Sequence, residues 1–90
     1  MLLFTPAGNS SQVSDGAAAL LIASRAYAKQ HGLKPRARFV STAVAAADPV
    51  IQFTAVLDST RKALKEAGLS INDIDLFEVN EAFAVVSLLS

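Results

Sequence analysis

The chain has 90 residues, eight Lys plus Arg against eight Asp plus Glu, and no cysteine. Balanced charge gives no electrostatic reason to bind nucleic acid or an anionic membrane, and the absence of cysteine excludes disulfides and a thiolate zinc site. Because no apolar run is long enough to cross a membrane, we expect a soluble, cytoplasmic protein. We expect no metal site.

The first third of the chain is expected to be a loop, an apolar segment and a short helix. Residues 5–16 are rich in Gly, Asn, Ser and Asp, which favour a loop. The apolar run 17–22 suits either a buried strand or the start of a helix, and its periodicity does not decide between them. Ser24 is expected to cap a helix over residues 25–31, which Gly32 ends in a left-handed conformation.

Two extended segments are expected in the remainder. Pro35 prevents continuation of the helix, and residues 36–47 have the apolar pattern of a long strand. Residues 74–79 indicate a second, mostly buried strand that leads into Asn80. An apolar, helix-like stretch follows Asn80, so this residue is expected at a strand-to-helix corner.

A helix is expected between these strands. Its pattern starts near Thr54 and ends at Gly68, and Asp58 and Lys62 have the spacing of a favourable ion pair. Ser70 and Asp73 then suit a capped turn.

The order strand, helix, strand, helix, strand, helix favours the α/β class, with helices packed on a sheet and a right-handed parallel crossover. A domain boundary is expected between Gly32 and Pro35. The apolar share of 52% exceeds the usual range. Residues 82–90 also break off in an apolar stretch without a helix stop signal, so both ends are expected to lie within a larger fold.

Two motifs resemble the thiolase family, which includes acetyl-CoA acetyltransferases and 3-ketoacyl-CoA thiolases. The sequences Gly-Asn-Ser-Ser at 8–11 and Asp-Gly-Ala-Ala at 15–18 resemble the end of the first thiolase half. The sequence Asn-Glu-Ala-Phe at 80–83 resembles a motif of the second half. The resemblance spans nearly the whole chain and implies an internal fragment of a layered α/β/α fold. Residues 1–33 would end the first half (loop, strand, helix), and residues 34–90 would begin the second.

The resemblance also implies an activity. Thiolases are acyltransferases of fatty-acid metabolism that cleave or form 3-ketoacyl-CoA by reversible Claisen chemistry, with an acyl group held on a cysteine. By resemblance, Asn80 holds a water in an oxyanion hole, Ala82 and Phe83 line the slot for the pantetheine arm or acyl chain, and Ser11 contacts that arm. No cofactor is implied, since coenzyme A is a substrate. The implied partners are acyl-CoA, the remaining thiolase segments and, in the full-length family, further copies in a homo-oligomer.

Each of these residues also has a structural reading. Asn80 could cap the following helix, and Glu81 in its first turn would suit the helix dipole better than acid-base catalysis. Phe83 could belong to a core. A serine such as Ser11 usually bonds to nearby backbone in a polar loop.

The other polar candidates are weaker. His31 is the only histidine and is expected on the surface at a helix end, because the Gly-His-Pro stretch of thiolases is absent. Lys34, Arg36 and Arg38 could touch CoA phosphates, although a solvated charged edge is the simpler interpretation. The loop at 8–16 lacks the Gly-Lys-Ser/Thr of a nucleotide P-loop.

The chain departs from the thiolase pattern in two ways. Residues 53–58 replace a common Gly-x-Gly-Pro segment, and neither catalytic cysteine is present. Without a nucleophile an oxyanion hole cannot run acyl transfer, so the 90 residues alone are expected to be inactive. The alternative is a non-catalytic, thiolase-like packing or assembly module. Coding sequence continuous with the chain would decide between them, if it held a cysteine upstream and Gly-His-Pro downstream. An unrelated α/β domain is a weaker third option.

Overall fold

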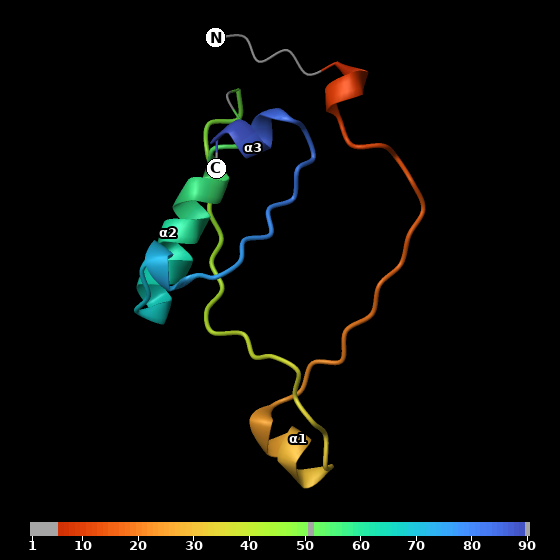
Figure 1. Ribbon diagram of the computed structural model, residues 1–90, viewed down its shortest axis with the longest axis vertical. Coiled ribbons are helices and arrows are strands. Elements are labelled where there is room, and N and C mark those ends of the chain that lie inside the picture. The colour runs from red at the N-terminus through yellow and green to blue at the C-terminus, as the bar shows by residue number, and fades with distance from the viewer. Residues whose placement is uncertain (1–5, 51, 90) are drawn as a thin grey trace.

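The computed structural model describes residues 6–50 and 52–89. In this part of the chain the elements are η1 (Ala7–Asn9), α1 (Arg25–Gln30), α2 (Ala55–Ala67), η2 (Ile71–Asp73) and α3 (Val85–Leu89). Figure 1 shows an open arrangement in which α1 lies apart from α2 and α3. The radius of gyration is 17.2 Å, whereas a compact chain of this length would have one of about 12 Å.

Few side chains are buried. Among the described residues only Ala28 in α1 and Val86 in α3 are buried. By contrast, Leu21, Val44 and Leu76 are 86%, 89% and 88% exposed. Each belongs to a different apolar segment. Those of Val44 and Leu76 were predicted as strands, and that of Leu21 as a strand or the start of a helix. Burial of apolar surface stabilises by roughly 25 cal/mol per Å². Covering these exposed segments with other parts of a protein would therefore be favourable.

Local hydrogen bonds define α1 as the sequence predicts. The Ser24 hydroxyl oxygen accepts a hydrogen bond of 3.1 Å from the backbone N–H of Tyr27, as expected of an N-cap. Gly32 has a φ of 63°, and the N–H of Leu33 donates to the carbonyl of Ala28 at 2.9 Å. This is the glycine-terminated helix end, in which a residue past the helix satisfies an otherwise free carbonyl.

Helix α2 also begins and ends as predicted, from Ala55 to the left-handed Gly68. The predicted ion pair is wrong in its partner, because Asp58 pairs with Arg61 at 3.1 Å and not with Lys62. Both spacings place side chains on one helix face, and the exposed pair contributes little to stability. The ammonium group of Lys62 instead donates to the carbonyl of Val44 at 3.2 Å.

Residues 41–47 lie along α2 in an extended conformation. Exposure alternates along this segment: residues 41, 43, 45 and 47 are half-buried and residues 42, 44 and 46 are exposed. The Ser41 hydroxyl donates to the carbonyl of Ala63 at 2.7 Å, which fixes the segment to the helix. A period of two is the side-chain alternation of a strand.

Residues of the second apolar segment reach α2 as well. Phe77 and Val79 line an apolar groove of about 310 Å³ together with residues of α2, among them Val56, Leu57 and Leu64. Helix α2 therefore contacts both segments that the sequence predicts as strands.

No strand forms in the part of the chain that the structure describes, so the strands expected at 36–47 and 74–79 are absent there. The apolar run 17–22, for which strand and helix were both open, forms neither. Apolar alternation favours an extended backbone, but a strand also needs a neighbour that accepts and donates its backbone hydrogen bonds. These segments have no such neighbour among the described residues, and the α/β sheet stays a prediction.

The turn after α2 forms as predicted. The Asp73 carboxylate accepts hydrogen bonds from the backbone N–H of Ser70 at 2.8 Å and from its hydroxyl at 2.7 Å. These two bonds, the backbone one first, hold the pKa of Asp73 below its ordinary value. Their stabilisation is present above the unfolded-state pKa and is lost as the pH falls through the folded-state pKa. Within the described ranges, no helix has the length and apolar character needed to span a membrane.

Candidate functional site

The two sequence motifs meet in space although they lie at opposite ends of the chain. Ser10 and Phe83 form an isolated antiparallel bridge. The N–H of Ser11 donates to the carbonyl of Ala82 at 2.9 Å, and the N–H of Ala84 donates to the carbonyl of Asn9 at 2.9 Å. We call this contact of residues 9–11 with residues 81–84 the junction.

Ser11 contributes its side chain to the junction as well as its backbone. Its hydroxyl donates to the carbonyl of Glu81 at 3.1 Å. The structural reading that a loop serine bonds to nearby backbone therefore does not hold, because the acceptor is 70 residues away in sequence. A hydrogen bond of this kind contributes about 0.5–1.5 kcal/mol.

Asn80 immediately precedes the junction in sequence and is exposed. Helix α3 begins only at Val85, so Asn80 is not its N-cap and Glu81 is not in its first turn. Both structural readings offered for these residues are thereby wrong. The Asn80 carboxamide makes no hydrogen bond to any residue that the structure describes, and the residue is exposed.

Ala82 and Phe83 are half-buried and form the apolar part of the junction. The ring of Phe83 contacts that of Phe53, with centroids 5.1 Å apart and planes tilted by 53°. Such aromatic pairs contribute about 0.5–1.5 kcal/mol beyond their buried area. The junction thus places the half-buried Ala82 and Phe83 next to the loop that holds Ser10 and Ser11.

No sequence pattern indicated that Phe53 packs against the junction. It lies in a turn before α2 where Gln52 and Phe53 have φ values of 54° and 59°. Left-handed angles in two successive residues other than glycine are not expected from residue type. A positive φ at a phenylalanine does not follow from residue type.

His31 is the C-cap residue of α1, the helix that lies apart from α2 and α3 (Figure 1). Its Nδ1 is 3.0 Å from the carbonyl of Tyr27, to which it donates, and the two rings stack with centroids 3.9 Å apart. This matches the expected role at a helix end, where the last carbonyls need donors.

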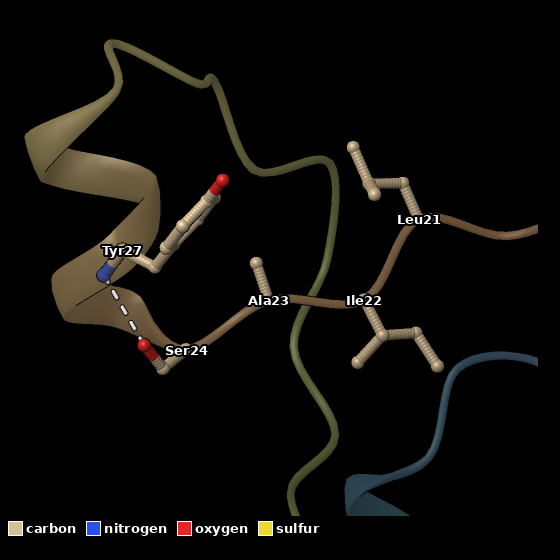
Figure 2. A pocket seen from close by; sticks show the side chains of 5 residues that line it. All are labelled: Leu21, Ile22, Ala23, Ser24 and Tyr27. Atoms are coloured by element: carbon tan, nitrogen blue, oxygen red, sulfur yellow. Dashed lines mark hydrogen bonds between the residues drawn. The ribbon is translucent and has the colours of Figure 1, made fainter.

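A hollow of about 380 Å³ lies beside α1 and is shown in Figure 2. It is lined by Leu21, Ile22, Ala23, Ser24 and Tyr27. None of the residues predicted for the site borders it. Its lining offers apolar side chains with one phenol and one hydroxyl, and that hydroxyl already accepts the α1 cap bond.

The remaining polar candidates are dispersed. Lys34, Arg36 and Arg38 are all exposed, as expected for a solvated edge. Among the described residues, no group of three or more His, Asp or Glu side chains gathers where it could hold a metal ion.

Comparison with known families identifies the class of protein. Residues 33–90 match the model of the thiolase C-terminal domain. The chain therefore belongs to the thiolase family, as its motifs indicated.

Three relatives illustrate the similarity. The chain is 56% identical over 82 residues to a 3-ketoacyl-CoA thiolase of Aliivibrio salmonicida, covering 91% of this chain and 21% of the relative. It is 52% identical over 80 residues to the steroid 3-ketoacyl-CoA thiolase FadA6 of Mycobacterium tuberculosis, covering 89% and 20%. It is 55% identical over 78 residues to a 3-ketoacyl-CoA thiolase of Salmonella typhimurium, covering 87% and 20%. The chain spans about a fifth of the length of these curated relatives.

Proposed function

We propose that these 90 residues form the part of a 3-ketoacyl-CoA thiolase that supplies the oxyanion-hole asparagine and one side of the CoA and acyl pocket. The junction carries this proposal, since two hydrogen bonds of 2.9 and 3.1 Å join Ser11 to the Asn-Glu-Ala-Phe motif and a third, of 2.9 Å, joins Asn9 to the following Ala84. Local preference does not bring residues 70 positions apart into contact, so this contact supports a shared place in one pocket. The names of the relatives support the substrate class.

The chemistry requires a nucleophile and a stabiliser of negative charge. In thiolysis a cysteine sulfur attacks the 3-keto carbonyl, and the bond between the second and third carbons breaks. The acyl group stays on sulfur, acetyl-CoA leaves after taking a proton, and CoA then accepts the acyl group. These 90 residues contain no cysteine, so other thiolase segments supply the sulfur and the acid-base groups.

Asn80 acts where charge develops on the thioester oxygen. Its carboxamide orients a water that donates a hydrogen bond to this oxygen. A neutral amide does so without introducing a charge that would shift the pKa of a neighbouring thiol. The exposed Asn80 side chain, without a partner among the described residues, is free for this task.

The other residues of the junction hold the substrate. Ser11 contacts the pantetheine arm, and Ala82 and Phe83 line the slot for that arm or for the acyl chain. CoA takes part as a substrate and no further cofactor is needed. In this proposal residues 1–33 end the first thiolase half and residues 34–90 begin the second, in a layered α/β/α fold whose sheet includes the extended segments. The complete enzyme is a cytoplasmic homo-oligomer.

A chimera tests the proposal. This chain replaces the matched segment of the Aliivibrio salmonicida thiolase, and thiolysis of acetoacetyl-CoA is followed by the loss of substrate absorbance. We expect kcat/KM within about tenfold of the parent enzyme, a change of about 1.4 kcal/mol in transition-state stabilisation. The parent enzyme is the control for assay and folding. A chimera with the melting temperature and oligomeric state of the parent but no turnover would count against the proposed function.

A further inference from the structure

The turn before α2 is strained. Gln52 and Phe53 both have left-handed φ values, 54° and 59°. The turn is closed by two short hydrogen bonds, from the N–H of Gln52 to the carbonyl of Asp48 at 2.8 Å and from the N–H of Thr54 to the carbonyl of Gln52 at 2.7 Å. A left-handed conformation costs a residue other than glycine about 1–2 kcal/mol. Such outliers cluster where a side chain serves a function.

The Phe53 ring packs against the junction. The ring is half-buried and packs on Phe83, with centroids 5.1 Å apart. This contact contributes about 0.5–1.5 kcal/mol, which is less than the cost of the turn, because Gln52 and Phe53 each cost about 1–2 kcal/mol in a left-handed conformation. A glycine at position 53 would avoid the strain and lose the contact, so stability alone gives little reason for a ring there.

The ring occupies space beside a residue that lines the proposed slot. Phe83 is bridged to Ser10, and the carbonyl of Ala82 accepts a hydrogen bond from the N–H of Ser11, so the two residues proposed to line the slot both lie in the junction. At a centroid separation of 5.1 Å the two rings are in contact, and no acyl chain fits between them. A chain that reaches Phe83 therefore meets Phe53.

We propose that Phe53 is a specificity-determining residue that closes the acyl slot against Phe83 and restricts the enzyme to short 3-ketoacyl chains. This inference rests on the proposed function, because it assumes that Phe83 lines the slot. Longer chains must displace the Phe53 ring and lose its contact with Phe83. Shorter chains end before they reach it.

The test is a series of variants at position 53 in the chimera. Phe53→Gly removes the ring and the strain at position 53, Phe53→Ala removes the ring and keeps that strain, and Phe53→Leu keeps most of the volume. For each, kcat/KM is measured with acetoacetyl-CoA and with 3-ketohexadecanoyl-CoA. We expect the ratio of long-chain to short-chain kcat/KM to rise about tenfold or more in the Gly and Ala variants, the effect of methylene-scale changes in an apolar pocket. The Leu variant keeps the preference of the chimera.

Several results would overturn the inference. An unchanged ratio in folded Gly and Ala variants shows that the ring does not limit chain length. A change in the Gly variant alone assigns the effect to backbone strain and not to the ring. If the chimera turns over acetoacetyl-CoA but the position 53 variants keep its ratio of long-chain to short-chain kcat/KM, the role of Phe53 is rejected and the proposed function stands. If a folded chimera shows no turnover, both are rejected.

Discussion

Replacing Asn80 by alanine in the chimera is expected to lower kcat for thiolysis by roughly 10²–10³, the usual effect of removing one oxyanion-hole donor. The reason is that the oriented water loses its anchor just when negative charge develops on the thioester oxygen. Because this interaction strengthens in the transition state, kcat and kcat/KM should fall together while KM changes little. Steady-state kinetics with acetoacetyl-CoA and CoA measure the effect.

Asn72 offers a matched control. It is an exposed asparagine in η2, outside the junction, so Asn72→Ala removes the same side chain elsewhere. We expect its kcat to stay close to that of the chimera. If Asn80→Ala retains full kcat, or if both variants lose activity equally, Asn80 does not stabilise the transition state.

The second large effect concerns the 90-residue chain on its own, which should show no thiolase turnover and should self-associate. It lacks a nucleophilic cysteine, and Leu20, Leu21, Val44 and Leu76 are each more than four-fifths exposed. Apolar segments with unpaired backbone groups associate with other chains. Thiolysis assays and analytical ultracentrifugation of the purified chain provide the two measurements.

A control distinguishes lost chemistry from lost folding. The chimera, assayed at the same active-site concentration, should turn over acetoacetyl-CoA while the isolated chain does not. Turnover by the isolated chain would refute the need for an external cysteine. A monodisperse monomer that unfolds cooperatively would refute the claim that its apolar segments require partners.

Features fixed by neighbouring residues were predictable from the sequence. The Ser24 cap, the left-handed Gly32 and Gly68, and the turn of Ser70 with Asp73 each depend on hydrogen bonds that span a few residues. Residue type determines such bonds because the partners are adjacent whatever the rest of the fold does.

Features that need distant partners were not predictable in the same way. Side-chain exposure alternates along residues 41–47, as it does in a strand. No described segment pairs with these residues through backbone hydrogen bonds, so the correct local pattern does not produce a strand. The late start of α3 likewise removed Asn80 and Glu81 from the helix terminus. Local propensity cannot fix a helix start when the preceding residues bind a distant loop, as residues 81–84 do.

The candidate site was predicted through family motifs and not through physical periodicity. Ser11 and the 80–83 motif were expected in one pocket, and the structure brings their backbones together. Phe53 was missed, since neither its left-handed φ nor its contact with Phe83 follows from residue type. Whether these side chains bind substrate remains the proposal that the kinetic variants test.

A crystal structure of the chimera with bound acetyl-CoA tests the central claim most directly. We predict that the Asn80 carboxamide binds a water within about 3 Å, the usual hydrogen-bond distance, and that this water contacts the thioester oxygen. Ser11 should lie along the pantetheine arm on the same side of the pocket. A ligand bound away from the junction, with Asn80 directed into bulk solvent, would contradict the account.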